Sequence, residues 1–422
     1  MNILLRQAKI VDPQSPFHNQ TADILVQNGI ITSIGQPVEN GFDQEIKVEG
    51  LCVSPGWVDL FAHFCDPGFE HRETLESGAA AAAAGGFTQV LLVPNTTPFT
   101  HNKSGVEYII QKSKHLPVQL TPIGAITKNG EGKELAEMYD MYNAGAAAFS
   151  DGWKPVQSAG LLLKALQYLK AIDATVIQLP DDNTINPNGL MHEGIVSTRL
   201  GLPGKPAIAE ELAIARDIEL VKYTGSKIHF TGVTTAKSIE LIAKAKQEGL
   251  PVTCSVAPYH LLFTDEDLKD YNTNLKVTPP LRTAADREAL RNAVLNGVVD
   301  CIASHHQPRN VDEKLVEFEY AKDGMLELQT SFAIVNTVLP QLTEERLVQL
   351  FSTNAQQIFG LQQATINEKE TARLTLFKRT GDWALQPKTN LSLSANTPFF
   401  NYSLKGKPLG IINKDKVFLN QD

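Results

Sequence analysis

Residues 57–95 read WVDLFAHFCDPGFEHRETLESGAAAAAAGGFTQVLLVPN and contain the pattern that most of the chain repeats. An apolar run, WVDLFAHF, is followed by a helix-forming stretch, RETLESGAAAAAA, and then by a second apolar run, TQVLLVPN. Continuous apolar strands separated by helices are typical of parallel strands that are buried on both faces. The stretch therefore predicts a strand, helix, strand unit of an α/β protein.

The same alternation continues toward the C-terminus. The further expected strands are VQLTPIGAI, GAAAFSD, ATVIQLP, KIHFTGV, PVTCSVAP and VDCIASHH. The expected helices include GVEYIIQKSK, GKELAEMYDMYNA, SAGLLLKALQYLK, AIAEELAIARDIELVKY, TAKSIELIAKAKQ and AADREALRNAV. Eight such units can close into a barrel, whose chemistry sits at the carboxyl ends of its strands. We therefore predict a (β/α)8 TIM barrel over residues 55–369.

The two ends of the chain have a different pattern. Residues 1–54 and 370–422 contain short strand-like runs separated by Gly, Pro, Asn and Asp, which predict one composite β-sandwich built from both termini. A long insertion at 181–206 follows the fifth strand. Long loops at the top of a barrel more often serve function than not.

Composition narrows the class of protein. The chain has 422 residues and a formal net charge of -9, which argues against nucleic acid as a partner. Its four cysteines have no metal-binding or redox spacing, and the N-terminus has no apolar signal core, so we expect a cytoplasmic protein. The most apolar stretch, residues 78–94, is interrupted by Gly85, Gly86 and Gln89, which predicts helix, turn and strand and no membrane span.

Polar motifs follow the predicted strands. They are HFCDPGFEHRET after the first strand, PNTTP after the second, AFSDG at the fourth, TPPLR before the last helix and NTPFFNYSLKGK near the C-terminus. In order and spacing, over essentially the full length, they resemble the type I dihydroorotases of the amidohydrolase superfamily. The resemblance implies an amidohydrolase-type barrel with a small β-sandwich, a role in pyrimidine biosynthesis, and zinc-dependent hydrolysis of a cyclic amide.

Several positions that the resemblance assigns to zinc or substrate carry unsuitable residues here. The first strand of the family carries Asp-x-His-x-His, followed by an arginine that binds the substrate carboxylate. The histidine ligands of strands five and six and an asparagine before PPLR are also expected. The residues that stand at these vacated positions are Phe61, Cys65, Leu179, Gly232 and Thr278. Phenylalanine, leucine and glycine offer no donor to zinc, which takes three or four protein ligands.

Other positions keep a usable side chain. His63 and Asp151 match two zinc ligands of the family, and His305 stands where the family has the aspartate that binds metal and acts as general base. Asn95 and Arg282 are candidates for contact with a small anion. We expect no catalytic residue and no cofactor, because two remnant ligands cannot activate water as the reaction requires.

The retained side chains also allow a different metal site. His305 and His306, with His63 and Asp151, could hold a single zinc ion if all four side chains point into the barrel mouth. The competing interpretation is that ordinary hydrogen bonds satisfy the histidines. We interpret His229 and His260 as structural, and we expect Asp59 to orient a neighbouring group rather than to act in catalysis. Phe61 and Leu179 predict a dry, filled barrel centre.

Three functions are compatible with these residues. The first is a pseudoenzyme of pyrimidine biosynthesis that associates with aspartate transcarbamoylase, as the resemblance to inactive family members implies, and that forms a homo-oligomer. The second is an active zinc-dependent cyclic amidohydrolase, acting on dihydroorotate or a related ring through the rebuilt site. The third is a barrel that binds a small molecule near Asn95 and Arg282 without catalysis.

Overall fold

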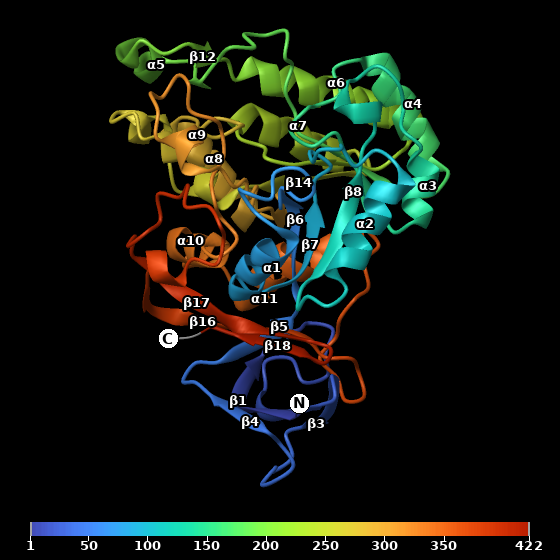
Figure 1. The fold of residues 1–422 in the computed structure, drawn as a ribbon, viewed down its shortest axis with the longest axis vertical. Coiled ribbons are helices and arrows are strands. Elements are labelled where there is room, and N and C mark those ends of the chain that lie inside the picture. Colours follow the sequence, from blue (N-terminus) through green and yellow to red (C-terminus); the bar gives the residue numbers. More distant parts are fainter. Residues whose placement is uncertain (1, 421–422) are drawn as a thin grey trace.

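The computed structural model describes residues 2–420 and contains the expected barrel. Eight parallel strands follow one another in the order β15-β14-β13-β10-β9-β8-β7-β6. Their bounds are β6 Trp57–Ala62, β7 Phe87–Leu92, β8 Gln119–Gly124, β9 Ala148–Phe149, β10 Thr175–Gln178, β13 Ile228–Phe230, β14 Val252–Val256 and β15 Cys301–Ile302. Each lies within one of the eight apolar runs, except that β7 begins one residue before its run, so the fold prediction is confirmed. Figure 1 shows these strands inside a ring of helices.

These helices match their predicted segments, with one difference: α1 Leu75–Ala84, α2 Lys103–Ser113, α3 Met138–Asn143, α4 Ala159–Lys170, α6 Ile208–Thr224, α7 Ala236–Gln247 and α8 Ala284–Leu295. After β15 the chain also forms α10 Ser331–Val338, α11 Glu344–Val348 and α12 Asn354–Ile358, for which no segment was named in advance. The helix expected over 132–144 forms only as α3. Gly130 and Gly132 take positive φ angles of 60° and 67°, and the chain forms a 3-10 turn at Lys128–Gly130 before α3 begins.

The first and last barrel strands are joined by contacts between their ends. The backbone N–H of His63 donates to the carbonyl of His306 at 2.9 Å. The carboxylate of Asp59 on β6 accepts from the N–H of Ser304 at 2.6 Å and from its hydroxyl at 2.8 Å. Asp59 therefore links β6 to the segment after β15, which agrees with its expected orienting role.

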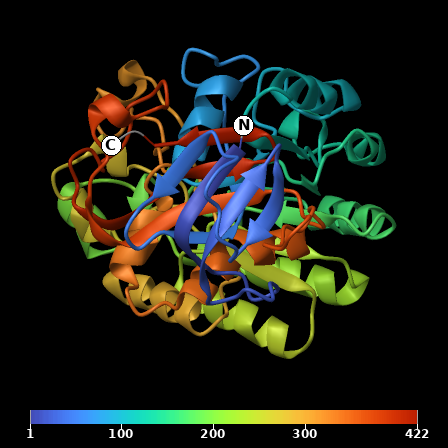
Figure 2. The same cartoon turned by 90° about the horizontal axis from the view of Figure 1, so that it is seen from below.

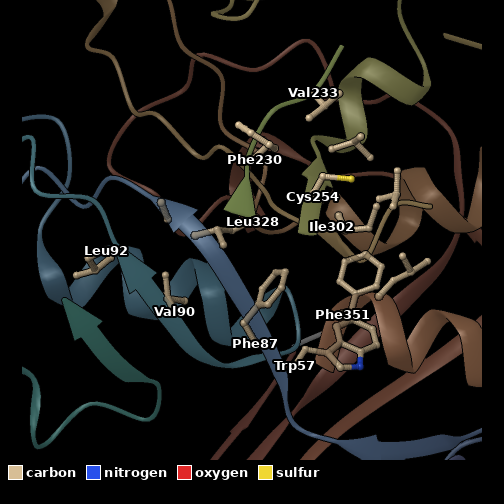
Figure 3. Close-up of a cluster of buried hydrophobic side chains, with 14 of the residues drawn as sticks. Trp57, Phe87, Val90, Leu92, Phe230, Val233, Cys254, Ile302, Leu328 and Phe351 are labelled. Atoms are coloured by element: carbon tan, nitrogen blue, oxygen red, sulfur yellow. The ribbon is translucent and has the colours of Figure 1, made fainter. Parts of the chain in front are cut away.

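A large apolar cluster fills the space around the lower part of the barrel (Figure 3). Trp57 is its centre: its ring lies 5.0 Å from that of Phe332, 5.1 Å from Phe351 and 5.3 Å from Phe377. Phe377 belongs to the C-terminal sheet, so the same cluster packs that sheet against the barrel. Burial of several aromatic rings supplies a large hydrophobic driving force at this junction.

Both ends of the chain contribute to a second, separate sheet. Its order is β18-β17-β16-β5-β1-β2-β3, and β4 pairs with β1 beside β5. The bounds are β1 Asn2–Ile10, β2 Thr21–Gln27, β3 Ile30–Ile34, β4 Gln44–Lys47, β5 Cys52–Pro55, β16 Arg373–Trp383, β17 Leu404–Asn413 and β18 Lys416–Leu419. Antiparallel pairing of β16 with β5 joins the two termini. Figure 2 shows the N-terminal strands in front of the barrel, seen from below.

The insertion at 181–206 forms a small element beyond the barrel strands. It contains β11 Met191–His192, α5 Ile195–Leu200 and β12 Gly204–Lys205, with β11 and β12 paired in parallel. Figure 1 shows α5 and β12 at the end of the molecule opposite the composite sheet. No helix within residues 2–420 is long and apolar enough to cross a membrane.

Candidate functional site

The end of β6 places Phe61 in the barrel mouth, where the resemblance expects a histidine ligand. Phe61 is fully buried, and its ring centroid lies 4.8 Å from those of both Trp153 and His305. The planes of the Phe61 and His305 rings are tilted by 32°, whereas Trp153 meets Phe61 edge-on at 62°. These rings occupy the centre of the mouth, and Leu179 at the end of β10 is equally buried.

His305 is held by the residues after β13. Its Nε2 atom lies 2.8 Å from the hydroxyl of Thr231, and its Nδ1 atom is buried without a partner among the described residues. Burial lowers the pKa of His305 to about 3, so the ring is neutral at physiological pH. A Cβ atom on Gly232 would come within 2.5 Å of His305 Cε1. The imidazole therefore uses the space that a side chain at position 232 would need.

His63 and Cys65 lie together beside the ring stack. The Cys65 sulfur is 3.5 Å from His63 Nδ1, and His63 Nε2 is buried without a partner among the described residues. Burial, followed by the positive charges of Arg309 and Arg72, lowers the pKa of His63 to about 3. Burial raises the pKa of the Cys65 thiol well above its usual range. Both groups are therefore uncharged, and the thiol is not a ready thiolate donor for a metal.

Asp151 uses its carboxylate to hold the preceding strand end. It accepts from the backbone N–H groups of Ile126 and Thr127, each at 2.9 Å, and from the Thr127 hydroxyl. Burial raises the pKa of Asp151 to about 6 despite these bonds. Asn95 stabilises the turn at residues 151–153: its amide N–H donates to the carbonyl of Asp151, and its amide oxygen accepts from the N–H of Trp153. Asp151 and Asn95 thus both contact backbone groups of neighbouring strand ends.

His306 makes contacts different from those of the adjacent His305. Its Nδ1 atom accepts from the N–H of Glu327 at 3.2 Å, and its Nε2 atom lies 3.5 Å from the carboxylate of Glu73. The side chain therefore contacts the segments before α1 and α10, whereas His305 contacts Thr231. The two histidines therefore have different partners, and no group of three or more possible metal ligands in residues 2–420 includes them.

Arg282 and Thr278 lie at the rim of the mouth. Arg282 is buried and donates to the Thr234 hydroxyl and to the carbonyl of Lys205, and its guanidinium is 3.7 Å from Glu210. Thr278 donates to Asp323 at 2.5 Å. A cavity of about 200 Å³ is bordered by Trp153, Leu179, Arg282 and the insertion, but not by Asn95. This is smaller than the roughly 300 to 1,000 Å³ of most small-molecule sites.

Two other histidines lie where structural roles were predicted. His229 contacts the hydroxyls of Thr253 and Ser255, each at 2.9 Å, and His260 Nε2 contacts the carbonyl of Pro279 at 3.0 Å. Trp153, which completes the aromatic stack, was not among the expected site residues. Its position two residues after Asp151, at a strand end, is the signal that could have indicated it.

These residues do not fit the zinc centre that the resemblance implies. In residues 2–420, no group of three or more His, Cys, Asp or Glu side chains could hold a metal ion. His63, His305 and His306 each have one buried ring nitrogen without a hydrogen-bond partner, but the Nε2 atom of His306 faces Glu73 at 3.5 Å, and the carboxylate of Asp151 accepts from Ile126 and Thr127. A zinc site needs three or four ligands that converge on one point, and these side chains do not converge.

Known proteins resemble this chain along its whole length. Residues 50–238 match the dihydro-orotase-like family model. A dihydroorotase of Acetivibrio thermocellus is 41% identical over 99% of this chain and 100% of that protein. One of Syntrophus aciditrophicus is 36% identical, with 100% of both chains covered. Among solved structures, the L-hydantoinase of Arthrobacter aurescens superimposes with a TM-score of 0.85 at 24% identity, covering 99% of this chain and 98% of that one. The structural likeness supports the fold, a barrel with a small β domain.

Proposed function

The chain belongs to the dihydroorotase family, and from that membership we propose that it serves pyrimidine biosynthesis as a non-catalytic member that acts by association with aspartate transcarbamoylase. The proposal combines two parts, loss of hydrolysis and gain of a binding role. They rest on different observations and are tested separately.

Loss of hydrolysis rests on one observation, the ring stack of Phe61, Trp153 and His305 in the barrel mouth. Opening a cyclic amide near neutral pH needs a hydroxide, and an enzyme of this type obtains it by lowering the pKa of metal-bound water from about 15.7 to about 7. The stack places apolar and neutral rings in the barrel mouth, and on this ground we expect it to leave no room for a metal-bound water there.

A second candidate is an active hydrolase with a rebuilt site. The buried, unpartnered nitrogens of His63, His305 and His306 favour it, because imidazole nitrogens without a hydrogen-bond partner are good zinc ligands. The two candidates predict opposite results for the same protein. Loaded with zinc and desalted, it should retain far less than one zinc per chain and should not hydrolyse dihydroorotate. One zinc per chain, with turnover that a chelator abolishes, would establish the hydrolase instead.

Association is supported by exposed apolar side chains that follow β15. Val311, Leu315 and Tyr320 are 62%, 81% and 68% exposed. Val311 lies in α9 Val311–Lys314, and both Val311 and Leu315 border a shallow hollow that also contacts Ala395. Exposed apolar groups that are gathered in one segment are common at protein interfaces. We propose that this segment contacts the transcarbamoylase.

Co-purification tests the binding role. The tagged full chain should retain aspartate transcarbamoylase from the same organism under mild salt, and light scattering should show a homo-oligomer. Leu315→Asp should weaken retention, whereas Ile195→Asp on α5, where Ile195 is 79% exposed, should not. Failure of the unmodified protein to retain the transcarbamoylase would remove this part of the proposal.

A further inference from the structure

A second cavity lies at the end of the barrel opposite the mouth. It has a volume of about 700 Å³ and lies between the start of β8, the end of α2 and the turn from β17 to β18. Its walls therefore come from both the barrel and the composite sheet. A volume of this size falls in the range of pockets that hold small organic ligands.

Positive charge surrounds this cavity. Its border includes the four cations Lys114, Arg373, Lys414 and Lys416 and a single carboxylate, that of Asp415. Within residues 2–420, none of these five forms an ion pair. The ammonium of Lys416 instead donates to two backbone carbonyls. An excess of unpaired positive charge is unexpected by chance in a chain whose net charge is -9, and it favours an anionic ligand.

Arg373 is the central cation of this group. Its Nη2 atom donates to the amide oxygen of Gln362 at 2.5 Å, and its Nε–H is shielded from solvent without a hydrogen-bond partner among the described residues. Burial lowers the pKa of Arg373, and no carboxylate offsets that effect. A buried guanidinium N–H without an acceptor is costly, and a phosphate oxygen is an acceptor that suits the planar guanidinium.

The rest of the wall offers neutral polar groups. Gln119 and Gln362 contribute amides, and Thr121 contributes a hydroxyl. A narrow cleft continues from the cavity past Arg373 toward Gly56. The cavity is far larger than an inorganic phosphate ion, so the amides would contact a polar organic body. We propose that this junction binds a small phosphorylated organic molecule, with its phosphate on Arg373 and the lysines and its body against the glutamines.

Such a ligand would touch both the barrel and the composite sheet and would stabilise their junction. By linkage, a ligand that binds only the folded protein raises its free energy of unfolding as its concentration exceeds Kd. Binding at the junction does not depend on the proposed function, because the mouth and this cavity share no residue.

Calorimetric titration of the full chain tests the proposal with AMP, glucose 6-phosphate and phosphoserine as probes. Adenosine, glucose, serine and inorganic phosphate are the matched controls. We expect saturable binding of at least one organic phosphate, about tenfold or more tighter than its dephosphorylated partner and than inorganic phosphate. No saturable binding by any of the three, or equal binding by inorganic phosphate, would overturn the proposal.

Variants locate the site. Arg373→Gln should weaken the bound phosphate compound by about tenfold or more, and Arg373→Lys should weaken it less because the charge remains. Lys414→Gln should also weaken binding. Lys414 lies at an exposed turn, so this variant tests the site even if Arg373→Gln does not fold. Lys164→Gln removes the same charge from the exposed face of α4 and should have no effect. Equal affinities for the Arg373→Gln, Lys414→Gln and Lys164→Gln proteins would refute the assignment.

Discussion

Replacing Gly232 by alanine probes how tightly the barrel mouth is filled. Gly232 has a φ of +67°, and the new Cβ would lie 2.5 Å from His305 Cε1 and 3.2 Å from Leu179 Cδ1. The left-handed backbone costs a non-glycine residue about 1 to 2 kcal/mol. Overpacking against a ring that is held between Phe61 and Thr231 adds about 1 to 3 kcal/mol.

Gly201 supplies a matched control for the backbone part of that cost. It ends α5 with a φ of +68°, and a Cβ atom added there would meet nothing within 4 Å. Gly201→Ala therefore carries the conformational cost alone. Urea unfolding should give Gly232→Ala a free energy of unfolding lower than that of Gly201→Ala by about 1 to 3 kcal/mol.

A second substitution separates the ring contact from other causes. His305 itself has a φ of +50°, which asparagine tolerates, and His305→Asn removes the Cε1 atom that the new methyl would meet. In that background the extra loss of Gly232→Ala relative to Gly201→Ala should shrink to what the 3.2 Å contact with Leu179 Cδ1 causes. If the extra loss persists in full without the ring, or if Gly232→Ala is no worse than Gly201→Ala in the unmodified protein, the account of a filled mouth is wrong.

Three further outcomes are expected from unfolding measurements. Asp59→Ala should lower the free energy of unfolding by about 1 to 3 kcal/mol, because it leaves the N–H of Ser304 without an acceptor. Ser304→Ala keeps that N–H bond and should lower it less. Equal losses for the two variants would contradict the link between β6 and the segment after β15. Arg282→Met should cost about 3 kcal/mol by leaving Glu210 as an unpaired buried charge, and a loss below about 1 kcal/mol would argue against that pairing. Burial lowers the pKa of His229 from 6.5 to about 3 in the folded protein. As the pH drops from 6.5 toward 3, the ring therefore takes up a proton in the unfolded chain but not in the folded one, and the free energy of unfolding falls. His229→Gln should reduce that fall by up to about 1.4 kcal/mol per pH unit in urea titrations at pH 7, 6 and 5, and an unchanged slope would show that this ring does not contribute.

The barrel was predictable because its signal is local. Each strand appears as an apolar run and each helix as a periodic segment, and their order alone permits few folds. The identities of Phe61 and Leu179 also predicted a filled mouth, since apolar side chains at a strand end have no other favourable place than the interior. The shortened α3 departs from its pattern because residues 134–136 pair with the backbone of residues 126–128: the N–H of Lys128 donates to Glu134 and the N–H of Ala136 donates to Ile126, each at 2.9 Å.

What the sequence determined by itself is the backbone: the order of strands and helices, and the places where imidazole ligands are missing. Only the tertiary structure decided what the remaining polar side chains do. Asp151 could have faced the mouth, but its carboxylate is bound by Ile126 and Thr127, about 25 residues earlier in the chain. The adjacent His305 and His306 acquire different partners because those partners come from segments distant in sequence. Backbone elements are encoded by neighbours along the chain, whereas a buried polar group takes whichever donor or acceptor folding brings within about 3 Å.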